Sequence, residues 1–512
     1  MPPSRESQPS SRALVWTVKI IVVLLFLAAA AAGTVTADWK LRSLDFHSRD
    51  YAFYAQFAAR LLNTNLTNRY ALQPEGYNFL GLVGTEGVYS FHQSLHLEPI
   101  KYAYAPIHQA FGGILAVFAV AAGAYFLPVL YLNFCDPGEK NVELAFVLLA
   151  ALLYLLYPSA LETATYDLRP RLLLAAFFAL AMLAVIYRRG MWEKVFTFGL
   201  MFLAREEALV YGPVVIAFNY VRTADKKKRH VSTAALGAIW MIALAVTAWY
   251  FDWTGYAVKP DVNRDEFIRL TPGMGLLILA VGLVMGTIFT VATRKRERFP
   301  AWTQILAYGA VFVPLGVQTF SDVRRLLERG YSRHEVFERV LLSPQMNTYL
   351  IVPLWILLVV LWQAIPRHRL RVWFNLGLVL LLAYFLRINL HYMPPRYDQY
   401  VQAAEAAKIV FATRQSTAQT STHILTDYVT YQAFYDYEHA LAYNRLPTDL
   451  LKGEQRYYPK NVETVKSLLA EETEYVVIAE SSERTLHPLL AKLAITPLER
   501  RVDGGYVVMK LR

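Results

Sequence analysis

Apolar segments long enough to cross a lipid bilayer recur along this chain of 512 residues. As a helix, about 20 apolar residues span the roughly 30 Å hydrocarbon core. With 55% hydrophobic and 18% charged residues, the chain has the composition of a polytopic membrane protein. After an apolar stretch at residues 14–33, further segments of spanning or near-spanning length lie at 107–132, 142–160, 171–187, 232–251, 274–293, 301–319, 348–365 and 371–388.

The connections between these segments set the expected orientation. Fifteen Lys and Arg residues lie in four of them, RRGMWEK, RTADKKKRH, RKRERF and PRHRLR, and the positive-inside rule places such loops in the cytoplasm. The net charge of +11 therefore reflects membrane orientation and does not indicate nucleic-acid binding. The single cysteine, Cys135, excludes an intramolecular disulfide and a cysteine-rich metal site. We expect a multi-pass protein of the cytoplasmic (inner) membrane.

Three charges interrupt the apolar stretch FGLMFLAREEALVYGPVVIAF at residues 198–218, namely Arg205, Glu206 and Glu207. Each charge at a bilayer centre costs roughly 2.5–3.5 kcal/mol on insertion scales. The stretch joins two basic loops, so keeping both loops in the cytoplasm requires an even number of crossings. We therefore predict a broken hairpin whose two short helices meet at these charges towards the outer face. Irregular backbone at that depth is tolerated where it is buried in protein or lines a wet cavity.

With this hairpin, the sequence predicts a mainly α protein, a membrane helical bundle of about eleven segments at residues 14–389. A small extracytoplasmic α/β domain is expected at residues 390–512, because the β-rich runs HILTD, HALAYN, YVVIAE and GGYVVMKL alternate there with helical stretches. Residues 1–13 are predicted to be a disordered cytoplasmic tail. Residues 14–37 fit either a retained first helix, which we prefer, or a cleaved signal.

Two segments between the helices are expected on the outer side. The first outer loop, residues 37–105, is long, aromatic and histidine-bearing. The segment 320–347 carries five arginines, and its apolar residues have helical spacing. It fits either amphipathic helices on the membrane surface, with Arg324, Arg325 and Arg333 able to bind lipid phosphate, or a solvated basic loop.

Four groups of polar residues converge on the outer face under this topology. Carboxylates beside arginines at a membrane boundary suit transfer of a group from a lipid-linked phosphate. A carboxylate accepts the proton of the attacking hydroxyl, and arginines neutralise the phosphate that leaves. The groups are Asp45, His47, Asp50 and Gln56 after the first helix; His92, His96 and Glu98 before the second; Asp167, Arg169 and Arg171 in ATYDLRPR; and Arg205, Glu206 and Glu207.

These residues also have simpler interpretations. Asp167, Arg169, Arg205 and Glu206 can pair with one another merely to hold helices together. Asp50 directly precedes the helical pattern YAFYAQFAARLL, so it can serve as a helix N-cap.

A metal site and a further arginine are also candidates. His92 and His96 are four residues apart, a ligand spacing on a helix, and with Glu98, His47 or Asp50 they could hold a divalent cation. Loop histidines at chance spacing are the alternative, and no other cofactor is indicated. Arg396 ends the HYMPPR stretch, which we expect to be a stiff proline linker, although its arginine could also face the site.

The order of the motifs resembles that of a known family. The motifs are RDYAFYAQ with Asp50 and Gln56, HLEP with His96 and Pro99, YDLRP at 166–170 and REE at 205–207. They resemble a prokaryotic family of predicted polytopic membrane proteins of unknown function, whose members show Asp-x5-Gln, His-x-x-Pro, Asp-Phe-His-Pro and Lys-Glu-Asp motifs. The resemblance covers residues 40–400. Arg169 stands where the family often has histidine, and Arg205 and Glu207 replace lysine and aspartate.

That family is similar to the GT-C glycosyltransferases, which include protein mannosyltransferases and the aminoarabinose transferase acting on lipid A. The resemblance implies a GT-C fold, a polyprenyl-phosphate-linked sugar as donor, and an acidic residue of the first outer loop as catalytic carboxylate. That role would fall to Asp50, with Asp45 in reserve. The residues expected to bind substrate or phosphate are then Gln56, Asp167, Arg169, Arg205, Glu206, Glu207 and Arg396.

The leading hypothesis is an inverting glycosyl transfer from a polyprenyl-phosphate-linked sugar to an acceptor of unknown identity at the outer face of the bilayer. A transporter or flippase of a lipid-linked substrate would also bury charges along its pathway, although the sequence shows no pair of similar halves. A noncatalytic envelope-assembly protein would use the same charges only to stabilise helix packing.

Overall fold

The chain divides into two compact units in the computed structural model. A helical unit comprises Met1–Gly33, Ala119–Thr165 and Pro170–His391, and a sheet unit comprises Thr34–Phe118, Tyr166–Arg169 and Tyr392–Arg512. The residues that the structure describes are 12–46, 51, 54–55, 58–59, 79–80, 97–135, 141–166, 168, 170–254, 327, 330, 332, 336, 352–365, 368–418, 422–427, 429–437, 440–443, 469–470 and 473–512.

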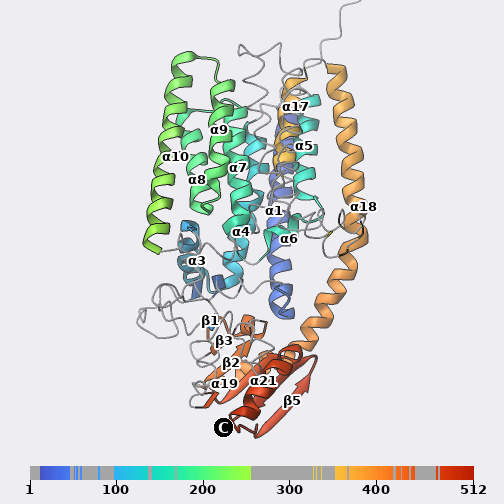
Figure 1. Ribbon diagram of the computed structural model, residues 1–512. Coiled ribbons are helices and arrows are strands. Elements are labelled where there is room, and N and C mark those ends of the chain that lie inside the picture. The colour runs from blue at the N-terminus through green and yellow to red at the C-terminus, as the bar shows by residue number, and fades with distance from the viewer. Residues whose placement is uncertain are drawn as a thin grey trace, which may run out of the picture. The chain divides into compact units, whose positions relative to one another are not determined.

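Helices build the described part of the helical unit (Figure 1). Among the described residues, four helices are long and apolar enough to cross a membrane, namely α1 (Arg12–Ser43), α4 (Ile114–Cys135), α10 (Lys226–Thr254) and α18 (His368–Ala406). The prediction of a mainly helical membrane protein is therefore confirmed. The shorter helices are α5 (Asn141–Leu155), α6 (Ala160–Ala164), α7 (Pro170–Ile186), α8 (Met191–Ala204), α9 (Ala208–Arg222) and α17 (Val352–Ala364).

Helix α7 forms the core of the helical unit. All of its residues from Leu172 to Ile186 are buried, and it packs against α8, α9 and α17. A helix that is apolar on every side is stable only where other helices surround it. Its many alanines also let neighbouring backbones approach closely, as is typical of membrane helix interfaces. The burial of α7 thus follows from its sequence.

A proline and a tryptophan join α9 to α10. Pro213 lies inside α9 and has no N–H to donate to the carbonyl of Leu209 four residues earlier. The indole Nε1 of Trp240 donates to that carbonyl at 3.0 Å instead. A Cβ on Gly212 would lie 2.5 Å from the same indole, so only glycine leaves room for it. The helix contact therefore supplies the hydrogen bond that the proline removes.

Two predicted helix boundaries were wrong. The segment 107–132 is divided into α3 (Tyr104–Phe111) and α4, because Gly112 and Gly113 adopt φ of 74° and 150° and end α3. The proline linker expected at 391–396 lies within α18, which continues to Ala406. Each proline removes only one backbone donor, and the residues that follow favour helix. The predicted segments 274–293 and 301–319 lie outside the described residues, as does nearly all of 320–347.

The described part of the sheet unit contains a six-stranded mixed sheet of order β1-β3-β2-β4-β6-β5 (Figure 1). Four of the strands are parallel, and β6 and β5 complete the sheet in antiparallel pairing. The four predicted β-rich runs are confirmed as β2, β3, β4 and β6. Two strands were missed, because β1 has only two residues and β5 is exposed throughout. The strands are β1 (Phe79–Leu80), β2 (Ile424–Asp427), β3 (Ala440–Tyr443), β4 (Tyr475–Ala479), β5 (Glu499–Asp503) and β6 (Tyr506–Lys510).

Helices cover both faces of this sheet. Helix α21 (Glu480–Lys492) contributes Leu486, Leu489 and Leu490 to one buried cluster, together with Val476 and Ile478 of β4. On the other face, α19 (Lys408–Thr417) packs beside a second cluster that includes Val410, and also Val477 of β4. Successive residues of β4 therefore enter opposite clusters, as the period of two of a strand requires.

The segment after α1 completes the core of the sheet unit. Leu44 adopts a left-handed backbone conformation, with φ of 53°, and is buried in the same cluster as Val410 and Val477. The backbone of Phe46 exchanges two hydrogen bonds of 3.3 Å with the side-chain amide of Gln432. Strand β1, also from the segment between α1 and α3, pairs with β3. The C-terminal sheet and this segment thus belong to one compact unit.

Candidate functional site

The predicted break between α8 and α9 is confirmed. Helix α8 ends at Ala204, Arg205 is extended with φ of −169° and ψ of 155°, and α9 begins at Ala208. The backbone N–H groups of residues 208–210 bond to the carbonyls of residues 205–207. Glu206 and Glu207 therefore precede the first turn of α9, where the positive end of the helix dipole favours carboxylates. Residues 195–221 do not form one uninterrupted helix.

A buried arginine lies between two carboxylates at this break. Arg205 is 7% exposed, and its Nε lies 3.5 Å from Oε1 of Glu206 and 3.7 Å from Oε1 of Glu207. The two carboxylates are more accessible than the arginine, with side-chain exposures of 15% and 28%. The break thus combines one buried cation with two partly accessible anions. Such a group can orient a cationic or hydroxyl-bearing ligand, or extend its arginine to a phosphate.

A second charged cluster lies in the sheet unit, beside the HLEP motif. Glu98 is buried and accepts a hydrogen bond of 2.6 Å from the hydroxyl of Tyr54. Pro99 begins the short helix η2 (Pro99–Ala103), whose backbone N–H at Lys101 bonds to the carbonyl of Glu98. The Lys101 side chain is itself buried. A carboxylate and an ammonium are thus held out of water within one helical turn.

The YDLRP turn is fastened to this cluster. Tyr104 is the first residue of α3, and its hydroxyl donates a hydrogen bond of 3.1 Å to the carbonyl of Leu168. Leu168 is buried and adopts a left-handed conformation with φ of 57°. Its neighbours Asp167 and Arg169 lie outside the described residues. The structure therefore brings the turn between these two candidates beside the segment that carries Glu98.

The end of α1 positions Asp45 and an aromatic stack. The N–H of Asp45 bonds to the carbonyl of Lys40, and the Lys40 side chain is buried with its Nζ 6.0 Å from the ring centre of Phe46. Phe46 stacks on Tyr51 at 4.0 Å and on Phe118 at 5.3 Å. Tyr51 directly follows Asp50, so the chain beside this candidate is attached to a fixed ring.

Two polar atoms in this region are buried without a hydrogen bond among the described residues, the hydroxyl of Tyr51 and Nε2 of His108. Burial raises the pKa of Tyr51, and nearby Tyr435 and Asp436 raise it further. Burial also lowers the pKa of His108, although Asp436 opposes this shift. Both groups are therefore neutral near pH 7, and both retain hydrogen-bonding capacity.

The remaining predicted residues are distributed as follows. Arg396 lies in α18, within the sheet unit, and its neighbour Tyr397 packs edge-on against Trp39 of α1 at 5.1 Å. No group of three or more metal-ligating side chains occurs in the described part of the chain. The candidates outside the described residues are His47, Asp50, Gln56, His92, His96, Asp167, Arg169, Arg324, Arg325 and Arg333.

Sequence reasoning missed the buried cations Lys40 and Lys101. Both lie in segments that appear interfacial, DWKLR after an apolar helix and EPIKY before one, where long basic side chains normally extend to water. The nearby acid Glu98 was the only available signal for Lys101. No comparable signal distinguished Lys40.

No protein-family model matches the chain, and no curated protein is similar to it in sequence. Among solved structures, it is similar to ArnT from Cupriavidus metallidurans in the apo state, with 14% identity and a TM-score of 0.42 over 98% of this chain and 99% of ArnT. It is also similar to the oligosaccharyltransferase AglB from Archaeoglobus fulgidus in complex with an inhibitory peptide and a dolichol-phosphate. The identity is 14% and the TM-score 0.43, over 93% of this chain and 71% of AglB.

The apo form of the Archaeoglobus fulgidus oligosaccharyltransferase gives 12% identity and a TM-score of 0.39 over 92% of this chain and 71% of the other. The likeness of the chain to these three structures is thus distant. Because all three TM-scores are below 0.5, no residue role is carried over from them.

Proposed function

We propose that the chain is a membrane glycosyltransferase that transfers a sugar from a polyprenyl-phosphate-linked donor to an acceptor at the outer membrane face. The observation that carries this proposal is the break at Arg205, Glu206 and Glu207, where a membrane hairpin holds a buried cation between two carboxylates. Ionisable groups in membrane segments are costly and mark functional sites. The order of the sequence motifs supports the same reaction class.

In the proposed reaction, the acceptor oxygen forms a bond to C1 of the sugar while the bond from C1 to the donor phosphate breaks. Attack opposite the leaving group inverts the configuration at C1. Asp50 takes the proton of the acceptor hydroxyl, and the polyprenyl phosphate leaves with the electron pair of the broken bond. Asp45 is the reserve base. A positioned general base contributes about 10²–10⁴-fold to such a step.

The cations of the site have the complementary role. Arg205 and Arg169 neutralise the departing phosphate, and Glu206 orients Arg169 or the sugar. Removing one group that stabilises developing charge in a dry site typically costs about 10²–10³ in rate. The sheet unit also holds a buried cation, Lys101, three residues after Glu98, and this supports a role in phosphate binding for that unit as well.

The test uses the full chain in lipid nanodiscs and a panel of short-chain polyprenyl-phosphate sugars, with release of polyprenyl phosphate as the readout. Asp50→Asn should abolish release while leaving abundance and melting temperature unchanged. Asp503→Asn, an exposed change in the sheet unit, is the matched control. Release by Asp50→Asn at the wild-type rate would remove Asp50 from the mechanism.

Two further measurements separate the rival functions. A flippase moves the intact lipid-linked sugar, so reconstituted vesicles would show transbilayer movement of the donor without release of polyprenyl phosphate. Glu206→Gln separates catalysis from packing: a packing role predicts a lower melting temperature, and a role in the reaction predicts lost release at normal stability. A divalent cation at His92 and His96 would be indicated by loss of release with a chelator and its recovery with added metal.

A further inference from the structure

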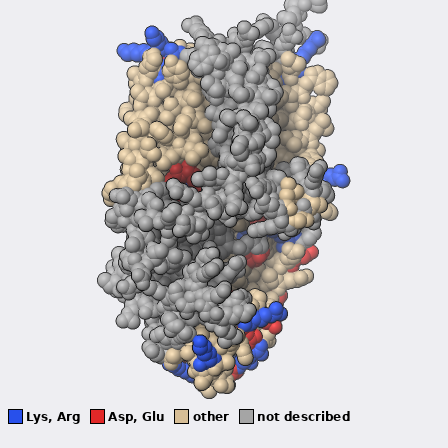
Figure 2. Space-filling model, in the orientation of Figure 1, with Lys and Arg blue, Asp and Glu red and all other residues tan. Residues whose placement is uncertain are grey.

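One end of the α7–α10 bundle is strongly basic. The α7–α8 and α9–α10 turns meet there, since Lys194 of α8 donates to Asn219 of α9 and Arg222 donates to the carbonyl of Ile186 at the end of α7. Within the described α7–α8 and α9–α10 turns, the carboxylates beside these cations are Glu193 and Asp225. Figure 2 shows Lys and Arg side chains gathered at this end of the bundle. The cations are Arg188, Arg189, Lys194, Arg222, Lys226, Lys227, Lys228 and Arg229.

Lys194 is the buried member of this group. It is 5% exposed, and its Nζ donates to Oδ1 of Asn219 at 2.8 Å and to Oγ1 of Thr223 at 3.4 Å. Asn219 in turn donates to the hydroxyls of Ser232 and Thr233. Every one of these partners is neutral. A buried ammonium normally has a carboxylate partner, because neutral oxygens replace its hydration only in part.

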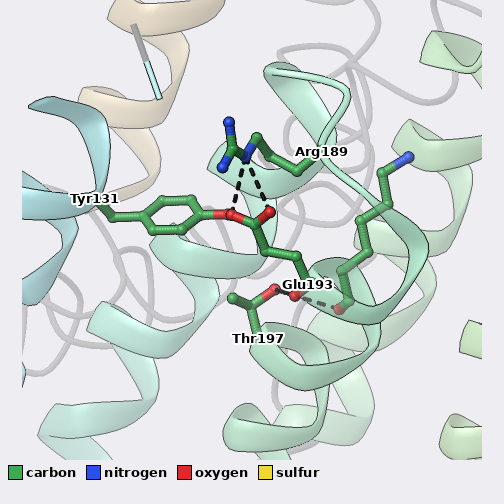
Figure 3. A network of polar contacts seen from close by, with 5 residues as sticks. Tyr131, Arg189, Glu193 and Thr197 are labelled. Carbon is green, nitrogen blue, oxygen red and sulfur yellow. Dashed lines mark hydrogen bonds and ion pairs between the residues drawn. The ribbon is translucent and has the colours of Figure 1, made fainter. Parts of the chain in front are cut away.

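The two nearby carboxylates are used elsewhere. Glu193 accepts hydrogen bonds from Nε of Arg189 at 2.9 and 3.0 Å and from the hydroxyl of Tyr131 at 2.5 Å (Figure 3). Asp225 is exposed and caps α10, accepting the N–H of Lys228 at 2.9 Å. Among the described residues, therefore, no carboxylate neutralises Lys194.

The exposed cations surround the start of a membrane helix. Lys226, Lys227 and Lys228 are exposed and occupy the first turn of α10, where the helix dipole adds further positive charge. The apolar part of the candidate span Lys226–Trp249 follows these cations along α10, and side chains such as Ile242 and Trp249 are exposed along it. The basic end therefore lies where an apolar span begins, at the level of lipid headgroups.

We propose that this basic end binds the phosphate of an anionic membrane phospholipid, with Lys194 as its buried cation and Lys226, Lys227 and Lys228 as its exposed rim. The charge of the site and its place at the end of an apolar span favour a lipid over a soluble anion. Basic sites between membrane helices near a surface recognise anionic headgroups in this way. The proposal does not depend on the reaction proposed above.

The test measures retention of phosphatidylglycerol and phosphatidylcholine by the full chain, purified in a neutral detergent, using native mass spectrometry. The rim variant carries Lys→Gln at 226, 227 and 228. Its matched control carries Lys408→Gln, Arg484→Gln and Lys492→Gln, which remove three exposed cations from the sheet unit. Each lysine near a headgroup contributes about fivefold at low salt, so the rim variant should bind phosphatidylglycerol about a hundredfold more weakly. The control should bind it as the wild type does.

Three results would overturn the proposal. The first is equal retention of the two lipids by the wild type, and the second is equal phosphatidylglycerol binding by the rim variant and its control. The third is stabilisation of the folded chain by inorganic phosphate that is as strong as its stabilisation by phosphatidylglycerol. That result would show that the site binds a soluble anion. Lys194→Met adds a separate check: its loss of lipid binding should depend less on salt than the loss in the rim variant, because buried charges are screened less.

Discussion

Leu44 offers the sharpest test of how the sheet unit is held together. This residue comes from the end of α1, yet it is 4% exposed and packs in the cluster that contains Tyr431, Phe434 and Val508. Truncating a buried leucine to alanine costs about 3–5 kcal/mol, with the larger values where the surroundings cannot close over the cavity. Because rigid rings belong to this cluster, we expect Leu44→Ala to cost at least about 3 kcal/mol.

The backbone of Leu44 makes a second, more specific outcome possible. At a φ of 53°, alanine retains the steric strain of the left-handed conformation, whereas glycine does not. Leu44→Gly should therefore be less destabilising than Leu44→Ala by roughly 1 kcal/mol, even after the entropy cost of glycine. Leu425 in β2 is the control: there, glycine should be worse than alanine by about 0.5–1 kcal/mol.

Hydrogen exchange of the β2, β4 and β6 amides measures this prediction directly, because it reports the opening of the sheet unit and not of the whole chain. A loss of about 3 kcal/mol should accelerate exchange at these amides by about two orders of magnitude. Exchange in Leu44→Ala at the wild-type rate would show that Leu44 does not belong to this core. If glycine were more destabilising than alanine at Leu44, as it should be at Leu425, the result would contradict the left-handed backbone of Leu44.

Three other predictions follow from single contacts. Trp240→Phe removes the donor to the carbonyl left free by Pro213 and should lower the free energy of unfolding by about 1 kcal/mol. The same change should cost little in a Pro213→Ala background, and a double-mutant cycle of thermal unfolding measures the difference. Asp427→Asn should cost about 3 kcal/mol, seen as faster exchange in β2 and β4, because the two buried carboxylate oxygens accept five hydrogen bonds. The pKa of Glu483 is lowered in the folded chain, chiefly by the hydrogen bond from Arg500. The Glu483 carboxylate therefore stabilises the fold fully above its unfolded pKa of 4.5, and this stabilisation is lost as pH falls through its lower folded pKa. The difference in melting temperature between wild type and Glu483→Gln should then be constant above about pH 5 and disappear at lower pH; a constant difference down to pH 2 would contradict this.

The features that could be predicted from sequence are those set by local pattern. The break at Arg205–Glu207 follows from charges placed between two basic loops, since a single crossing would violate the positive-inside rule. Strands β2, β4 and β6 follow from short apolar runs of β-branched residues. Both predictions use residues close together in the chain, and both are confirmed.

The features that could not be predicted depend on contacts between distant segments. The pairing of β1 with β3 joins residues more than 300 positions apart, and two residues carry too little pattern to indicate a strand. The burial of Lys40 and Lys101 also goes against the local signal, because basic side chains beside apolar helices normally extend to water. The helical path through Pro394 and Pro395 also depends on context, because the local signal favours a break there.

The composition of the sheet unit has a consequence for the proposed reaction. Leu44 enters its core, Gln432 holds the backbone of Phe46, and Tyr51 stacks on the Phe46 ring. Asp50 lies in the sequence between Phe46 and Tyr51, and these two flanking residues are held by Gln432 of the sheet unit and by aromatic packing. A carboxylate that must meet an acceptor hydroxyl within hydrogen-bond distance gains from such fixing. On this reasoning, the sheet unit helps to position Asp50, the proposed base, and removing the C-terminal sheet should impair the proposed reaction even if every charged residue of the proposed site remained.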